Sequence, residues 1–146
     1  MTDRDADGGE EDILTVDLSG ARALVGYRSS FPADPSQGAC SLEIGPQHLN
    51  RLGLLHGGFV SMLLDNGCGV AVRHSLGNVD ATVVTVTLTV NFVSAARSGR
   101  VVATGRVTGG GRSLKFAEAE LRHESGRLLA TATAAFKVAA STGKQT

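Results

Sequence analysis

Residues 59–76 read FVSMLLDNGCGVAVRHSL and are predicted to form one long helix that starts at Gly58. The segment is apolar nearly all round, and its polar residues are sparse. A helix with this profile is buried on most sides, as when a sheet wraps around it. Gly67 and Gly69 each cost about 1 kcal/mol relative to alanine in a helix interior, so we expect another backbone to approach the helix closely. The helix should end near residues 77–78.

A long alternating segment follows this helix. Residues 84–92 read VTVTLTVNF, and this period-two alternation of apolar and polar residues predicts a β-strand. Three more strands are expected at hairpin spacing, over residues 100–108, 112–122 and 127–138, with turns at 94–99, 109–111 and 123–126. The four strands are therefore predicted to form an antiparallel meander. The fold class we expect is α+β, with one long central helix wrapped by a curved antiparallel sheet.

The N-terminal part of the chain is less regular. It contains strand-sized pieces at residues 13–18, 21–27 and 39–44, a turn-rich segment at 31–38, and an irregular loop at 46–58. Residues 1–12 carry six acids against one base and have too few apolar groups to offset the entropy of ordering. We therefore expect a disordered acidic tail over 1–12, a single domain over 13–140 and a flexible C-terminus over 141–146.

Composition and charge exclude several classes of protein. The chain has 146 residues, which is enough for one domain with its own core. No apolar run reaches the roughly 18 residues that span a bilayer, and the acidic N-terminus resembles neither a signal nor a transit peptide, so we expect a cytoplasmic protein without a membrane partner. Outside the tail, 13 bases stand against 8 acids. This excess is too weak and too scattered for nucleic acid, but it suits an anionic small ligand.

The segment Asn50-x5-His56-Gly57-Gly58-x6-Asp65 contains the candidate chemistry. Asp65 has apolar neighbours in the predicted helix, so its carboxylate must be paired, hydrogen-bonded or neutral. Such a carboxylate can act as a general base or a nucleophile. It can equally well cap a local group or emerge at the wet edge of the helix, and the local pattern leaves these interpretations open.

The residues that precede the helix also allow two interpretations. The first N–H groups of a helix have no internal partners and lie at its positive end, so Gly57 and Gly58 could form an oxyanion site. The pattern alone favours a tight strand-to-helix turn. His56 could be a base, although anchoring of the loop is the favoured role, and Asn50 alone is simply a turn residue. The histidines and the two cysteines lack metal-ligand spacing, so no metal site is expected, and Cys40 and Cys68 should be reduced thiols.

Taken together, residues 50–72, NRLGLLHGGFVSMLLDNGCGVAV, resemble the active-site region of hotdog-fold acyl-CoA thioesterases. The similarity is greatest to the phenylacetate-pathway (PaaI-like) branch of the 4-hydroxybenzoyl-CoA thioesterase superfamily. That branch has an HGG loop leading into the central helix, an acidic residue one or two turns further on, and an upstream asparagine. The later segments TVVTVTLTVNFVSAAR and RSLKFAEAEL also fit the family's layout, and the resemblance covers about residues 38–138.

The resemblance implies a role for each matching residue. Asp65 would activate or position the attacking water, or attack as a nucleophile. The backbone N–H of Gly57 would polarise the thioester carbonyl, and Asn50 and His56 would orient the carbonyl and the loop. Thr85 would supply a hydroxyl that holds the water. However, if the apolar face of its strand packs on the helix, Thr85 is turned away.

The resemblance also implies a homo-oligomer and a substrate. The family's sites form between two protomers, so we expect an obligate dimer, commonly a dimer of dimers, and the helix glycines are a reason to expect close packing there. The expected substrate is an acyl-CoA, without a cofactor. Residues expected to contact substrate are Gly58, Phe59 and, at strand ends where they could bind phosphates, Arg97, Arg112 and Lys115; Phe31, Phe59 and Phe92 could line a pocket.

The function implied is hydrolysis of an acyl- or aryl-CoA thioester to free acid and CoA. A non-catalytic acyl-CoA-binding hotdog protein, acting as a sensor or scaffold, is the alternative. A hotdog hydratase or dehydratase, which would also use an acid/base pair, is a third hypothesis. A buried acid beside HGG favours catalysis, because a pure binder has no use for a costly carboxylate there.

Overall fold

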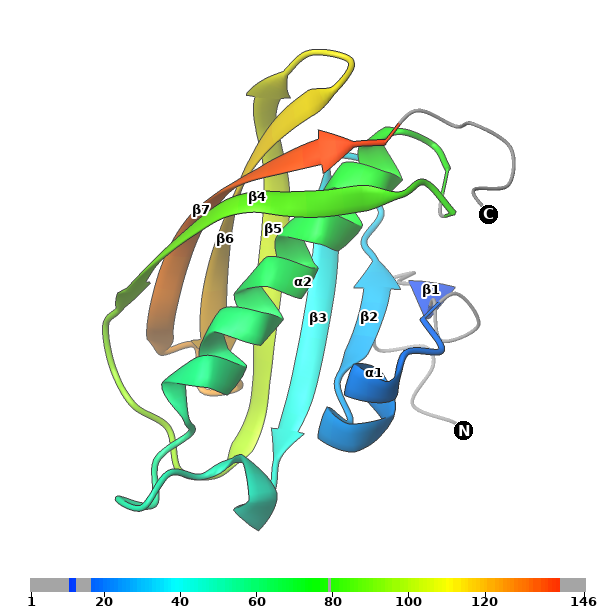
Figure 1. The fold of residues 1–146 in the computed structure, drawn as a ribbon. Helices are drawn as coiled ribbons and strands as arrows, with labels where there is room; N and C mark the ends of the chain where they lie inside the picture. Colours follow the sequence, from blue (N-terminus) through cyan, green and yellow to red (C-terminus); the bar gives the residue numbers. More distant parts are fainter. Residues whose placement is uncertain (1–10, 13–16, 79, 140–146) are drawn as a thin grey trace.

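The predicted long helix is present as α2, Gly57–Ser75. In the computed structural model, which describes residues 11–12, 17–78 and 80–139, this helix lies across the concave face of a curved sheet (Figure 1). The helix ends at Leu76, and Gly77 follows with a φ of 65°, which confirms the expected end. Within the described residues, no helix is long and apolar enough to cross a membrane.

Among the residues that the structure describes, the sheet has seven antiparallel strands in the order β1-β2-β3-β5-β6-β7-β4. Their bounds are β1 Glu11–Asp12, β2 Arg28–Phe31, β3 Gln37–Ile44, β4 Val83–Phe92, β5 Gly99–Gly110, β6 Leu114–His123 and β7 Leu128–Val138. The α+β class and the four long strands are thus confirmed.

The predicted meander of four strands joined by three hairpins is wrong at its first connection. Strand β4 pairs with β7 and lies at the edge of the sheet, whereas β5, β6 and β7 do form consecutive hairpins. The backbone N–H groups of Val93 and Ser94 donate to the carbonyl of Leu129, and Ala96 accepts from Leu55. Segment 93–98 is therefore bound to β7 and to the loop before α2, and it crosses the end of the sheet instead of turning back.

The N-terminal part differs from the expected strand pieces. Residues 21–27 were expected to be extended, but most of them lie in helix α1, Gly20–Val25. Ser19 caps this helix by accepting the N–H of Arg22, and Gly26 ends it with a φ of 85°. The expected strand at 39–44 is confirmed within β3, and a 3-10 helix, η2 (Pro46–His48), begins the loop.

The expected terminal segments fall mostly outside the described residues. Residues 1–10, 13–16 and 140–146 are among those that the structure does not describe. Glu11–Asp12, which we expected in the disordered tail, form β1 and pair with β2.

Glycine allows the contact between α2 and the sheet to reach backbone distance. A Cβ on Gly105 in β5 would overlap the carbonyl of Gly67, and one on Gly38 in β3 would overlap the backbone of Ala71. A Cβ on Gly67 would lie 3.3 Å from Ala103. The close approach predicted at Gly67 is therefore confirmed, but its partner is the sheet of the same chain. The helix glycines do not by themselves indicate packing between protomers.

Both cysteines lie in the core between α2 and the sheet. Cys40 and Cys68 are fully buried and free. Burial raises the pKa of each thiol to about 12, so both are neutral at ordinary pH.

Candidate active site

Side-chain hydrogen bonds hold the loop that leads into α2. The Oδ1 of Asn50 accepts the backbone N–H groups of Leu52 at 2.9 Å and Leu54 at 3.1 Å. His48, which is buried, accepts the N–H of Gly45 on Nδ1, and its Nε2 lies 2.7 Å from the carbonyl oxygen of Val25. Because a carbonyl only accepts, Nε2 carries the proton. The loop is thereby bound to the end of α1.

His56 is the N-cap of α2. Its Nδ1 accepts the N–H of Gly58 at 2.8 Å, which is the geometry expected of a loop anchor. The N–H of Gly57 belongs to the first turn, where the helix offers no internal acceptor. The ring of Phe92 from β4 faces Gly57, with carbon atoms 3.3 and 3.4 Å from the position that a Cβ would take.

Asp65 lies two turns further along α2 and is half-buried. The hydroxyl of Thr85 in β4 donates to its Oδ1 at 2.7 Å. Asp65 is therefore hydrogen-bonded at a partly open face of the helix. This position fits a catalytic carboxylate as well as a carboxylate at the wet edge of the helix.

A β-bulge explains how Thr85 reaches Asp65. The register of β4 against β7 shifts between Thr85 and Thr87, so the side-chain alternation changes phase at this point. Leu88 packs against the core, whereas Val86 is exposed. The expectation that an inward apolar face turns Thr85 away is therefore wrong, because the bulge lets both Thr85 and Leu88 face the helix.

A depression of about 380 Å³ lies beside this pair. Its wall from α2 contains Asp65, Asn66, Gly69 and Arg73, and the remaining lining residues are Asp17, Ala81, Thr82, Val83, Thr85 and Phe136. Sequence analysis missed Asn66, Arg73 and Asp17. The spacing of four residues from Asp65 to Gly69 to Arg73 places the three on one helix face, and this was the signal available in the sequence.

Gly57 and Asp65 of one chain lie apart. Eight residues separate them, so they are about 12 Å apart along the helix axis. A single chain cannot bring the Gly57 N–H and the Asp65 carboxylate to one small carbonyl group.

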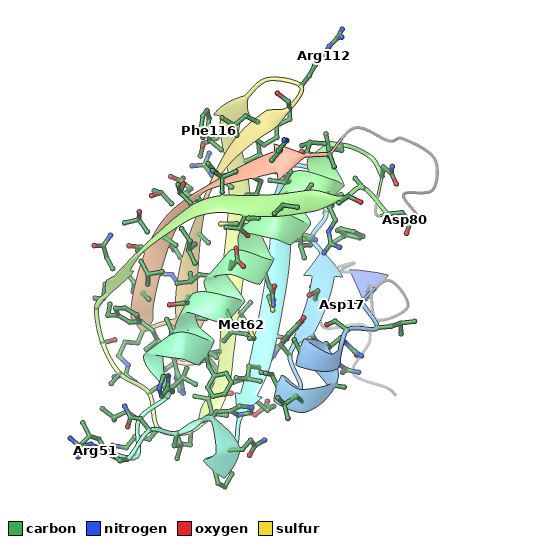
Figure 2. All side chains as sticks on the ribbon, in the orientation of Figure 1. Asp17, Arg51, Met62, Asp80, Arg112 and Phe116 are labelled. Atoms are coloured by element: carbon green, nitrogen blue, oxygen red, sulfur yellow. The ribbon has the colours of Figure 1, made fainter. Side chains whose placement is uncertain are left out.

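The three cations expected to contact phosphates do not gather in one chain. Nη1 of Arg97 donates to the carbonyls of Leu52 and Gly53 at 3.2 and 3.4 Å, next to Arg51. Figure 2 shows Arg51 at one end of the molecule and Arg112 at the tip of the β5–β6 hairpin, at the opposite end. Lys115 lies at the start of β6, on the hairpin side.

The aromatic residues expected in a pocket are also separated. Phe59 is half-buried, and its ring lies edge-on to the rings of His48 and His56. Phe31 is buried against Val70 and the ring of His74, so it does not line the depression at Asp65. Gly58, on the first turn of α2, is exposed.

No potential metal site is found in the described part of the chain, where no three His, Cys, Asp or Glu side chains lie close enough to hold an ion.

Comparison with known proteins connects this geometry to a family. Residues 52–130 match the family described as "Thioesterase superfamily". The mouse acyl-coenzyme A thioesterase 13 is 31% identical over 100 residues, which cover 67% of this chain and 70% of the relative. The human acyl-coenzyme A thioesterase 13 is 30% identical over 109 residues, covering 73% of this chain and 76% of the relative.

Solved structures agree with this assignment. The zebrafish thioesterase superfamily member 2 has a TM-score of 0.70 and 28% identity, covering 84% of this chain and 87% of its own. A conserved protein of Pseudomonas aeruginosa has a TM-score of 0.78 and 28% identity, covering 86% of this chain and 98% of its own. The family match includes all of α2 with Asp65, as well as β4, β5 and β6. The chain belongs to the thioesterase superfamily and is a thioester hydrolase.

Proposed function

We propose that this protein is an acyl-CoA thioesterase, which hydrolyses an acyl- or aryl-CoA to the free acid and CoA. The observation that carries the proposal is the Asp65–Thr85 hydrogen bond on the partly open face of α2. The thioester substrate follows from the family, and the acyl-CoA class is taken from the names of the curated relatives. A cytoplasmic location stays a prediction.

The side chains suit two routes of attack. In the first, Asp65 takes a proton from water, which attacks the thioester carbon; the C–S bond then breaks, and the CoA thiolate leaves and takes up a proton. In the second, Asp65 attacks the carbon itself, the C–S bond breaks with release of the CoA thiolate, and water then hydrolyses the mixed anhydride to the free acid and the Asp65 carboxylate. Thr85 holds Oδ1 at 2.7 Å, which leaves Oδ2 for the reacting group in either route. The Gly57 N–H, at the positive end of α2, stabilises the negative charge that develops on the carbonyl oxygen.

A dimer would complete this site. Strand β4 is the last strand of the sheet, and its side chains Val84, Val86 and Phe92 are 56%, 56% and 61% exposed. If two copies paired antiparallel about Leu88 of β4, Thr85 of one copy would lie opposite Asn91 of the other and next to its Phe92, because Thr85 and Asn91 are each three residues from that centre. Phe92 adjoins Gly57. Each Asp65 would then face the Gly57 of the second copy. We also retain the expectation of a dimer of dimers, which this site does not require.

Hydrolysis of an acyl-CoA panel tests the proposed activity. Short, long and aryl acyl-CoAs are incubated with wild type and with Asp65→Asn, and a thiol-reactive dye reports free CoA. The amide cannot accept a proton or form the anhydride, so we expect turnover to fall by about two orders of magnitude or more. Equal turnover by the variant would refute the role of Asp65. Tight acyl-CoA binding without turnover by wild type would favour the sensor alternative.

A subunit-mixing experiment tests the shared site. Gly57→Pro lacks the N–H, whereas Gly57→Ala keeps it and serves as the control. Its Cβ would lie 3.3 Å from the ring of Phe92, a tight contact that this exposed side chain can relieve by a small shift. Asp65→Asn and Gly57→Pro are each expected to be inactive. Co-expressed in equal amounts, they should recover about a quarter of wild-type activity, because half of the dimers are mixed and each mixed dimer has one intact site. Co-expressed chains no more active than the separate variants would contradict the shared site.

A further inference from the structure

His48, in the loop before α2, uses both nitrogens of its ring to join separate parts of the chain. The residue is only 2% exposed. Nδ1 accepts the backbone N–H of Gly45 at 2.9 Å, and Nε2 donates to the carbonyl of Val25, the last residue of α1, at 2.7 Å. Since one nitrogen accepts and the other donates, the ring is neutral and holds a single tautomer. It therefore binds α1 to the loop through a bond of defined direction.

Two contacts pass from His48 to the start of α2. Its backbone carbonyl accepts the N–H of His56 at 2.9 Å, and its ring meets the ring of Phe59 edge-on, with centroids 5.3 Å apart. Phe59 lies in the first turn of α2 and packs against the core. A shift of His48 would therefore move the N-cap residue and the first turn of the helix together.

The peptide group between His56 and Gly57 carries the N–H that is proposed to stabilise the oxyanion. Its carbonyl, which belongs to His56, accepts the N–H groups of Phe59 at 3.0 Å and Val60 at 3.1 Å. The N–H of the preceding peptide group donates to His48. Because a peptide group is planar, its N–H and carbonyl turn together. These hydrogen bonds on both sides of His56 therefore set the direction of the Gly57 N–H.

We propose that His48 is a positioning residue for the thioesterase reaction: its neutral ring, held by Val25 of α1, keeps the Gly57 N–H in its working direction. This inference rests on the proposed function and on its shared site, in which the loop of one copy faces Asp65 of the other. The bond to Val25 carries the effect, because it joins residues 23 positions apart, whereas the bond to Gly45 closes a local turn.

Two amide variants separate the bonds of the ring. In His48→Asn the side-chain oxygen takes the place of Nδ1 and can still accept the N–H of Gly45, but no group reaches Val25. In His48→Gln the longer side chain brings an N–H donor to the place of Nε2, so the bond to Val25 is kept. We expect kcat to fall about tenfold in His48→Asn, with KM changed less than about twofold, and to fall less than about threefold in His48→Gln. A wild-type kcat in His48→Asn, or an equal loss in both variants, would overturn the proposal.

His74→Leu is the matched control for the loss of a histidine-to-carbonyl bond. Nδ1 of His74 donates to the carbonyl of Gln37 at 2.7 Å, and His74 lies about 25 Å along the helix axis from Gly57. The variant should keep the wild-type kcat, and far-ultraviolet circular dichroism verifies that all three variants fold. A decrease as large as that of His48→Asn would attribute the loss to a general weakening of α2 and overturn the proposal.

Subunit mixing separates positioning from damage to the fold. In a mixed dimer of His48→Asn and Asp65→Asn, one site joins the intact Asp65 of the first chain to the intact loop of the second. Co-expressed in equal amounts, this pair should reach about a quarter of wild-type activity, against about a twentieth for the two variants combined without subunit exchange. His48→Asn co-expressed with Gly57→Pro should stay at about a twentieth, because every site then contains a changed loop.

The outcomes separate this inference from the proposals on which it rests. No gain from His48→Asn with Asp65→Asn, while Gly57→Pro with Asp65→Asn recovers activity, would overturn the role of His48 alone. If neither pair recovers activity, the shared site and this inference both fail. A wild type that hydrolyses no acyl-CoA would overturn the proposed function as well.

Discussion

The two faces of α2 differ in how complete they are within one chain. On the sheet face, Gly67 and Cys68 are fully enclosed, and Gly38 and Gly105 bring two strands to backbone contact. On the opposite face, Asp65, Asn66 and Arg73 are only half-buried and line a depression. Contacts within one chain cover the sheet face completely. The opposite face contains the candidate catalytic residues, and its polar side chains are left for a substrate or a second copy to contact.

The largest effect on stability is expected where the sheet face is tightest. In Gly105→Ala the new Cβ overlaps the carbonyl of Gly67, so helix and strand must move apart. We expect the free energy of unfolding to fall by about 3 kcal/mol, measured by urea denaturation. Gly109→Ala in the same strand is the control, because no atom lies within 4 Å of its Cβ position. Equal losses in both variants would mean that strand propensity, and not the helix contact, determines the effect.

The buried thiols predict a loss of stability at alkaline pH. Burial raises the pKa of Cys40 and Cys68 from 9.0 to about 12. Because the folded-state pKa is the higher one, their contribution is complete below pH 9 and is lost as the pH rises towards 12. Between pH 9 and 10 the two thiols together should lower the free energy of unfolding by about 2 kcal/mol. Urea denaturation of Cys40→Ala with Cys68→Ala should show a flatter profile over this range; an equally steep one would exclude the thiols as the cause.

A smaller effect, on rate and not on stability, is expected on the open face. Thr85→Val keeps the side-chain shape but removes the hydrogen bond to Asp65. We expect kcat/KM to fall about tenfold, equivalent to about 1.4 kcal/mol, with little change in the urea midpoint. Thr87→Val, beyond the bulge on the other face of β4, should leave kcat/KM unchanged. A similar decrease in both variants would attribute the effect to strand β4 in general.

The smallest effect compares the two helix glycines. A Cβ on Gly69 would lie 3.4 Å from Phe136, which is ordinary contact, whereas one on Gly67 would lie 3.3 Å from the backbone and Cβ of Ala103. Gly69→Ala should therefore stabilise the protein by up to about 1 kcal/mol through helix propensity, and Gly67→Ala should destabilise it. Thermal melting curves of both variants decide the comparison. If Gly69→Ala also destabilises, the depression is as tightly packed as the sheet face.

Periodicity in the sequence was sufficient to predict the long helix and strands, but it was insufficient to predict how they are connected. The apolar helix and the alternating strands were predicted because each repeats its pattern over many residues. Helix α1 was missed because its six residues are too few to show a helical period; the signals available were the cap residues at its ends, Ser19 and Gly26. The pairing of β4 with β7 could not be predicted, since a six-residue connection suits a hairpin as well as a crossover.

The candidate site shows the same limit. The segment from Asn50 to Asp65 was found through short-range spacing, and the structure adds that the Asn50 and His56 side chains hold the loop. The approach of Thr85 to Asp65 depends on a bulge, which inserts one residue into the alternation without any distinctive residue type. Arg97 and Arg112 were grouped by their strand-end positions, but strand ends lie at both ends of a sheet.

The free edge of β4 has a consequence for how the protein is made. Its sequence, VVTVTLTVNF, contains no proline and no charged residue, the two features that usually protect an edge strand from pairing with other chains. A newly synthesised monomer would thus display an aggregation-prone template until the edge is covered. The yield of active protein on expression would then depend on how long this edge stays uncovered, and less on the stability of the finished fold. Slower synthesis would reduce aggregation and leave β4 able to pair with a second copy. Charged residues placed on β4 would also reduce aggregation, but they would prevent the pairing of two copies as well.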